Sequence, residues 1–151
     1  MSGSKSRYLI RYKLWQGSWH PIVRLALRHR TRIIKVEAYV DSGALYSIFD
    51  VASAEHLGLD YRSGRLIWVT VGDGGNIPVY LHRLRFLFGR LDFPATVGFS
   101  DRLGVGFNLL GRKDIFERLS FTFNDYHHFL LVSDARDVAP EVLARLKLLQ
   151  K

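Results

Sequence analysis

Cysteine is absent from this chain of 151 residues, which excludes disulfide bonds and thiolate metal sites and fits a reducing compartment. Only four prolines are present and 48% of the residues are hydrophobic, so the composition does not predict a disordered chain. No stretch approaches the roughly 20 consecutive apolar residues of a membrane-spanning helix. The polar start, Met1–Lys5, is not followed by the apolar segment of a secretory signal. We therefore expect a cytoplasmic protein with no membrane partner.

The length and the charge bound the function further. A chain of 151 residues is typical of one domain with a substantial core. Its 22 lysines and arginines exceed its 14 aspartates and glutamates, which gives a net charge of +8. Such a surplus attracts nucleic acid, anionic membranes or acidic peptides. The basic side chains are spread along alternating positions, so a solvated sheet face explains them more simply, and nucleic-acid binding is possible but not favoured.

Alternation of apolar and polar residues predicts β-strands over most of residues 22–132. Residues 23–27 alternate in this way and predict a first strand. In the next, over residues 33–40, the even positions are apolar and face the core. Tyr39 and Asp41 continue the opposite, polar face. A carboxylate is therefore expected at the end of a half-buried strand.

Shorter signals predict the remaining elements. Asp50 and Gly58 delimit a short helix as its N-cap and its C-terminal stop, and the glycine-rich residues 72–76 predict the tip of a β-hairpin. Further expected elements are strands around 84–88, 93–99, 119–123 and 126–132, a short helix over 112–117 and a terminal helix from Pro140. We divide the chain into an N-terminal arm (1–19), a mostly β, barrel-like domain (20–132) and a C-terminal helical extension (133–151).

The most informative local pattern is Asp-Ser-Gly-Ala at residues 41–44. It sets a carboxylate at the end of a strand, followed by a small hydroxyl residue and a glycine that permits a tight turn. Alone it also suits an ordinary turn aspartate, because Asp-Ser-Gly is favourable in turns. A second pattern, Leu-Leu-Gly at residues 109–111, stands before the expected helix at 112–117. The two patterns together favour a catalytic loop.

From about Val36 to Asn124 the chain resembles the retropepsin-type aspartic proteases, the single-domain class that includes the retroviral proteases. The match comprises the Asp-Ser-Gly-Ala loop, the glycine-tipped hairpin in the place of the flap, and Leu-Leu-Gly-Arg before a helix and a strand. The resemblance implies a mostly β fold, a small closed β-barrel of the retropepsin-like acid protease type with short helices and a C-terminal helix. It implies that the catalytic residues are Asp41, Ser42 and Gly43, and that substrate is bound by Ala44, Gly72, Asp73, Gly74, Gly75, Leu109, Leu110 and Gly111.

Because each pattern occurs once, the resemblance implies a homodimeric aspartic endopeptidase that cleaves extended peptides. Two neighbouring carboxylates share one proton, since both cannot ionise cheaply. The ionised member takes a proton from a bridging water, while the protonated member hydrogen-bonds the scissile carbonyl. The Ser42 hydroxyl braces the two loops across the dimer, and the flap closes over the peptide. No cofactor and no metal ion are implied.

Two features depart from the retroviral pattern. Retroviral enzymes carry an acidic residue after the alanine, where this chain has Leu45. Arg112 therefore needs another partner or stays solvated. The chain also continues past the expected last strand, and residues 125–151 stand where retroviral subunits interlace their termini. This extension is expected to replace, reinforce or block that interface.

Two other functions stay open beside the protease. One is a retropepsin fold without catalysis, used for dimerisation or peptide binding. The other is a basic β-barrel that stacks nucleic-acid bases on its aromatic side chains, although packing explains those side chains more simply. A phosphate cradle at residues 72–75 lacks the Gly-Lys-Ser/Thr continuation and a following helix. His127 and His128 face opposite ways on a strand and rarely hold one metal ion together.

Overall fold

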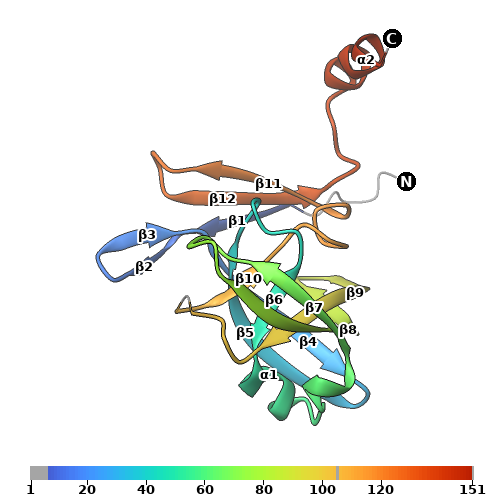
Figure 1. The fold of residues 1–151 in the computed structure, drawn as a ribbon. Helices are drawn as coiled ribbons and strands as arrows, with labels where there is room; N and C mark the ends of the chain where they lie inside the picture. Colours follow the sequence, from blue (N-terminus) through green and yellow to red (C-terminus); the bar gives the residue numbers. More distant parts are fainter. Residues whose placement is uncertain (1–6, 105, 151) are drawn as a thin grey trace.

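The structure, a computed structural model, describes residues 7–104 and 106–150. The first six residues of the expected N-terminal arm lie outside the described residues, as do Val105 and the last residue of the expected extension, Lys151. The described chain is mostly β with few, short helices, as the sequence predicts (Figure 1). Its elements are β1 (Arg7–Arg11), β2 (Lys13–Trp15), β3 (Ser18–His20), β4 (Ile22–His29), β5 (Arg32–Val40), β6 (Ser47–Asp50), α1 (Val51–His56), the 3-10 helix η1 (Tyr61–Ser63), β7 (Arg65–Thr70), β8 (Asn76–Phe88), β9 (Leu91–Ser100), β10 (Asn108–Leu110), β11 (Leu119–Asn124), β12 (Phe129–Asp134) and α2 (Pro140–Leu149).

Seven strands form the main sheet, in the order β4-β5-β10-β6-β9-β8-β7, and β4 also pairs with β8. The pairings therefore run from β4 through β5, β10, β6, β9 and β8 back to β4, with β7 attached to β8. Apolar residues from these strands meet in one buried cluster that includes Val23, Leu27, Phe86 and Phe99. Two smaller sheets lie beside this one, which the prediction of a single small barrel did not include.

The short strand β10 fixes the centre of the main sheet. It runs parallel to β5 and antiparallel to β6. The Asn108 side chain bridges the same neighbours: its Nδ2 donates to the Glu37 carbonyl and its Oδ1 accepts from the Asp50 N–H, both at 2.8 Å. The last residues of β5 and the strand β6 are thereby held against one short strand. Residues 41–46, which connect β5 to β6, start and end at fixed points.

A three-stranded sheet joins the two ends of the described chain, in the order β1-β12-β11. β1 pairs with β12 from Arg7 opposite Ser133 to Arg11 opposite Phe129. Figure 1 shows this sheet above the main sheet, with the β2–β3 hairpin projecting to one side. The sequence did not predict β1, β2 or β3. In β1, Leu9 is 72% exposed. The apolar residues of this strand therefore do not alternate with its buried face, and the pattern does not predict a strand.

Two local predictions are confirmed. Asp50 is the N-cap of α1, its Oδ1 accepting the Ala52 N–H at 2.8 Å, and Gly58 follows the helix with a φ of +66°. The glycine-tipped hairpin is formed by β7 and β8, which pair antiparallel from Arg65 to Thr70. Both features depend on contacts between residues close in sequence, where capping and turn preferences are strongest.

The strand that follows the predicted hairpin tip and the strand predicted at 84–88 are one continuous strand, β8. Its buried positions are odd up to Leu81 and even from Leu84 onward. The strand changes its buried face between these residues, because its first half pairs with β7 and its second half also pairs with β4. The adjacent polar residues His82 and Arg83 interrupt the alternation at that point, so the sequence pattern predicts two strands instead of one.

The short helix predicted over 112–117 is wrong, and the segment is a series of turns. Asp114 has a φ of +64°, a left-handed conformation that ends a helix. Its Oδ2 accepts the Thr96 N–H at 2.8 Å and pairs with Arg83 Nη1 at 2.9 Å, which favours the turn over a helix. The strand predicted at 126–132 starts later, at Phe129, because His128 also has a positive φ, of 55°.

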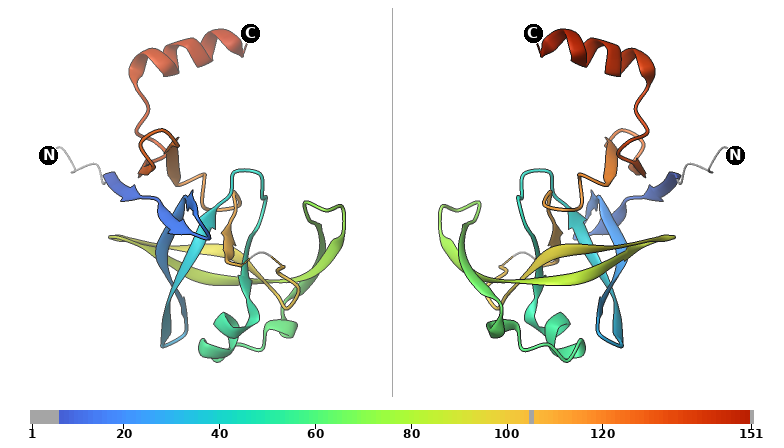
Figure 2. Two further views of the ribbon diagram at one scale, coloured as in Figure 1. Left: turned by 90° about the vertical axis from the view of Figure 1, so that its left-hand side faces the viewer. Right: turned by 90° about the vertical axis from the view of Figure 1, so that its right-hand side faces the viewer.

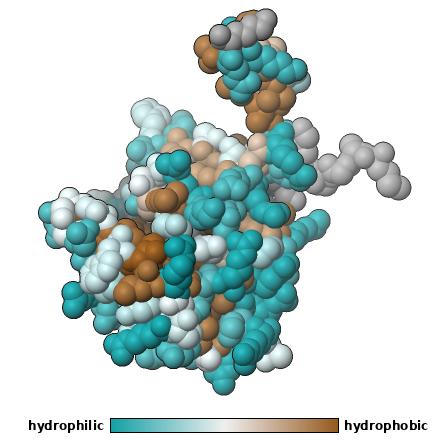
Figure 3. Space-filling model, turned by 45° about the vertical axis from the view of Figure 1, so that its right-hand side comes forward, coloured by the Kyte–Doolittle hydropathy of each residue, from teal (hydrophilic) through white to brown (hydrophobic). Residues whose placement is uncertain are grey.

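The predicted C-terminal helix is confirmed as α2, with Pro140 in its first turn. It stands away from the sheets in both side views of Figure 2, and none of its residues is buried. Figure 3 shows apolar side chains on its surface, and Leu149 is 82% exposed. No helix in the described part of the chain is both long and apolar enough to cross a membrane. The domain boundaries at residues 19 and 132 stay a prediction.

Candidate functional site

Asp41 begins the loop that follows β5, and its side chain is held by the backbone of its own turn. The Gly43 N–H donates to Asp41 Oδ1 at 2.9 Å, and the Ala44 N–H donates to the Asp41 carbonyl at 3.2 Å. The Asp41 N–H in turn donates to the Leu110 carbonyl of β10 at 3.0 Å. The carboxylate is half-buried, and Ser42 beside it is exposed. The loop therefore presents one oriented carboxylate to solvent.

The segment after β10 supports this loop from below. Gly111 is buried, and its N–H donates to Ser47 Oγ at 3.0 Å. A Cβ atom at residue 111 would lie 2.9 Å from the Ser47 nitrogen and closer still to the Tyr46 carbonyl, so only glycine fits. The Arg112 N–H then donates to the Ala44 carbonyl at 2.9 Å. Leu109, Leu110 and Gly111 thus lie next to the Asp41 loop, and their role in substrate binding stays a prediction.

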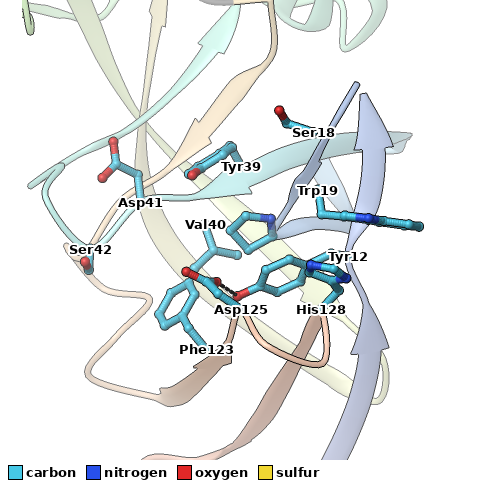
Figure 4. A pocket seen from close by; sticks show the side chains of 11 residues that line it. Tyr12, Ser18, Trp19, Tyr39, Val40, Asp41, Ser42, Phe123, Asp125 and His128 are labelled. Carbon is cyan, nitrogen blue, oxygen red and sulfur yellow. Dashed lines mark hydrogen bonds between the residues drawn. The ribbon is translucent and has the colours of Figure 1, made fainter. Parts of the chain in front are cut away.

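A cavity of about 610 Å³ opens beside Asp41 and Ser42 (Figure 4). β5 contributes Tyr39 and Val40, and the turn between β11 and β12 contributes Asp125 and His128. The other lining residues are Tyr12, Ser18, Trp19, Pro21 and Phe123. Three segments that are separate in the sequence, within residues 12–21, 39–42 and 123–128, therefore build one site.

Two tyrosines in this cavity are coupled to its carboxylates. The Tyr12 hydroxyl donates to Asp125 Oδ1 at 2.8 Å. Burial, this hydrogen bond and the Asp125 charge raise the pKa of Tyr12 to about 12. Burial also raises the pKa of Tyr39, and the charges of Asp41 and Asp125 add to that effect. Both hydroxyls therefore stay protonated at neutral and acidic pH and act as neutral groups.

The β2–β3 hairpin forms one wall of the cavity and is anchored at two points. Trp15 contacts Phe107 edge to face, with 4.7 Å between the ring centroids. Trp19 stacks on His128, with 5.1 Å between centroids and 17° between the planes. The hairpin thus spans from the loop before β10 to the turn after β11. Such packing holds Trp19 in place as a wall of the site.

The expected site residues do not all meet at this cavity. Asp41 and Ser42 line it, whereas Gly72, Asp73, Gly74 and Gly75 form the exposed tip of the β7–β8 hairpin and are not among its lining residues. The tip is ordered by its own hydrogen bonds, including Gly75 N–H to Asp73 Oδ1 at 2.8 Å. Gly43, Ala44 and residues 109–111 shape the loop without lining the cavity.

Sequence reasoning missed Asp125, Tyr12 and Trp19 as parts of the site. Asp125 follows the predicted strand at 119–123, and no local pattern connects it with residue 41. The aromatic side chains are explained most simply by packing, and Tyr12 is buried. The sequence pattern that does predict part of the site is the alternation along β5, which puts Tyr39 and Asp41 on the same face of the strand.

Several basic side chains of the strands are paired with carboxylates. Arg24 contacts Glu37 at 3.2 Å and Arg85 contacts Asp92 at 2.8 Å, both across exposed strand faces. These pairs support the interpretation of a solvated face. Arg112, whose retroviral partner position is Leu45, is exposed and forms no ion pair within the described chain. Among residues 7–104 and 106–150, no group of three His, Cys, Asp or Glu side chains is arranged to hold a metal ion.

Comparison with solved structures identifies the fold. The structure is similar to a retropepsin-like aspartic protease from Rickettsia conorii, with a TM-score of 0.64 and 18% identity over 83% of this chain and 98% of the other. It is also similar to the retroviral protease-like domain of Ddi1 from Leishmania major, with a TM-score of 0.52 and 16% identity over 79% of this chain and 98% of that domain. No protein-family model and no curated protein matches the sequence. The predicted retropepsin-like fold is therefore confirmed.

Proposed function

We propose that this protein, which has the fold of the retropepsin-like aspartic proteases, is a homodimeric aspartic endopeptidase. The observation that carries the proposal is the Asp41 loop: one carboxylate, held by the Gly43 N–H, borders an open cavity at the junction of β5 and β10. One chain offers this loop once, so the second carboxylate comes from a second copy. A two-fold axis between the loops makes the interface isologous.

The reaction follows from a pair of Asp41 side chains that share one proton. The ionised carboxylate removes a proton from a bound water, whose oxygen attacks the scissile carbonyl carbon. The protonated carboxyl donates a hydrogen bond to the carbonyl oxygen as charge develops there. Collapse of the tetrahedral intermediate breaks the C–N bond, and the leaving amine takes a proton from the pair. The pair then holds one proton again, as before the reaction, and a new water can bind between the carboxyl groups.

In this proposal the β7–β8 hairpin is the flap that closes over the substrate. It projects from the main sheet, and in Figure 2 its tip curves upward, toward the same end of the molecule as the segment that connects β5 and β6. Its tip, residues 72–75, is exposed and glycine-rich. A hairpin of this kind closes over an extended peptide and excludes water from the reaction.

The edge of β11 favours pairing with a second copy. In the described chain β11 pairs with β12 alone, so its other edge is open. Its sequence, from Leu119 to Asn124, holds no charged residue and no proline, the features that normally protect an open edge. Phe123 is 40% exposed and lines the Asp41 cavity. β12, which lies within residues 125–151, pairs with the other edge of β11. It thereby takes the place of one of the strands that retroviral subunits exchange.

Cleavage of a peptide library at mildly acidic pH tests the proposal. Wild-type chain is expected to cut, and Asp41→Asn to lose at least about a thousandfold in rate, as removal of a group that acts as part of a catalytic unit does. Glu141→Gln on the exposed helix α2 is the matched control and is expected to retain full activity. Light scattering gives the solution mass, expected at two chains.

Equal cleavage by wild type and Asp41→Asn, or no cleavage by a folded wild-type chain, would refute the proposed endopeptidase activity. A folded dimer without activity would instead favour the alternative, a retropepsin fold used for dimerisation or peptide binding. Nucleic-acid binding is the weaker candidate, because arginines such as Arg24 and Arg85 are already paired with carboxylates. Binding to RNA or DNA that falls steeply with salt would restore it.

A further inference from the structure

The cavity beside Asp41 has an acidic lining in a chain that is basic overall. The chain has a net charge of +8. Within the described chain, however, the lining includes the carboxylates of Asp41 and Asp125 and contains neither lysine nor arginine. Neither carboxylate forms an ion pair with a described residue. A concave surface of this sign attracts a cation.

Asp125 is held in one orientation, although it is exposed. Tyr12, which is buried, donates its hydroxyl proton to Asp125 Oδ1 at 2.8 Å, and the Tyr12 N–H donates to the His128 carbonyl at 2.8 Å. One oxygen of the carboxylate is thus engaged from the wall of the cavity. The carboxylate keeps further capacity to accept hydrogen bonds, because each oxygen has two lone pairs.

Aromatic rings form part of the wall and fit an organic cation better than a metal ion. Trp19 is 41% exposed and stacks on His128, and Tyr39 contributes a second ring (Figure 4). Faces of tryptophan and tyrosine attract ammonium and guanidinium groups, and long basic side chains also pack their methylene stems on such rings. A metal ion would need more oxygen or nitrogen ligands than these two carboxylates offer.

We propose that this cavity binds the lysine or arginine side chain of a peptide substrate and that Asp125 is the residue that selects it. The proposal rests on the proposed function, because the peptide reaches the cavity only when it binds at Asp41. Asp41 faces the scissile bond, whereas Asp125 lies on the turn between β11 and β12 and contacts the charged end of the side chain. The endopeptidase then cuts beside a basic residue.

Binding of a small probe tests the pocket without any need for cleavage. N-acetyl-lysine N-methylamide and its neutral norleucine analogue are titrated into the full chain, with NMR shifts of the Trp19 indole N–H as the readout. We expect lysine to bind about tenfold tighter than norleucine, from one ion pair and one ring contact. In Asp125→Asn, which keeps an oxygen to accept from Tyr12, the difference is expected to disappear. Glu141→Gln, which removes the same charge from α2, is expected to preserve it.

Equal affinity for the two probes, or lysine binding unchanged in folded Asp125→Asn, would overturn the proposal. Lysine binding that vanishes as the chain dimerises would also overturn it, because a basic side chain of the second copy would then fill the cavity.

Cleavage separates this inference from the proposed function. Asp41-dependent cleavage with no preference for basic residues would overturn the pocket and leave the endopeptidase intact. Lysine-selective binding that depends on Asp125, in a chain that cleaves no peptide, would support the proposed lysine pocket and refute the proposed endopeptidase activity.

Discussion

Gly111→Ala is expected to destabilise the fold through a single added methyl group. The new Cβ would lie 2.9 Å from the Ser47 nitrogen and closer still to the Tyr46 carbonyl. All these atoms are backbone, so no side-chain rotation relieves the overlap. β6 and the segment after β10 would have to separate, which strains the hydrogen bond from the Gly111 N–H to Ser47 Oγ. We expect a loss of about 3 kcal/mol in the free energy of unfolding, at the upper end of the cost of overpacking.

Urea unfolding followed by tryptophan fluorescence measures this loss. Gly104→Ala is the matched control, because a Cβ there meets no atom within 4 Å and the backbone has no positive φ. The control is expected to change stability by less than about 1 kcal/mol, since alanine also restricts the unfolded chain. If Gly111→Ala and Gly104→Ala had equal midpoints and slopes, the close approach of these two backbones would be disproved, and with it the account of how the Asp41 loop is supported.

Two further predictions concern groups that hold the sheets together. Burial by itself would raise the pKa of Asp114, but hydrogen bonds from Thr96 and nearby positive charges outweigh it, so the pKa is lowered from 3.8. Because the pKa of Asp114 is lower in the folded state, its carboxylate stabilises the fold at pH values above the unfolded-state pKa of 3.8. Asp114→Asn is therefore expected to lower the free energy of unfolding by about 1–2 kcal/mol at pH 7, and by progressively less below pH 3.8. Unfolding curves at several pH values check this, and a cost independent of pH would contradict it. Asn108→Ala removes the bonds to Glu37 and Asp50 and is expected to cost about 2–3 kcal/mol in urea unfolding, whereas a cost below about 0.5 kcal/mol would show that the bridge is unimportant.

The elements that sequence predicted best are those determined by neighbouring residues. Alternation predicted β4 and β5, Asp50 marked the start of α1, and the glycines marked the tip of the β7–β8 hairpin. The wrong helix at residues 112–117 arose where distant contacts override local preference. Asp114 adopts a left-handed conformation because Thr96 and Arg83 hold its carboxylate, and the segment expected to be helical becomes turns.

The candidate site divides in the same way. Asp41 was identified from a local loop pattern and from the parity of β5. Asp125, Tyr12 and Trp19 could not be assigned to it, because they meet only after β1 pairs with β12 and the β2–β3 hairpin packs on their turn. Pairing between the two ends of a chain leaves no periodic trace in either end. A local pattern thus predicts the proposed reacting group, while the surface that surrounds it is a product of long-range contacts.

The sheet β1-β12-β11 has a consequence for how this molecule assembles. In it, the early strand finds its partner within the same polypeptide, so no exchange of termini is required to complete a subunit. Each newly made chain can therefore reach its native state while dilute, and encounter with another copy becomes a separate, later event. If the proposed dimer is the active form, activity would rise with chain concentration, because the two Asp41 side chains would meet only above the concentration at which subunits associate.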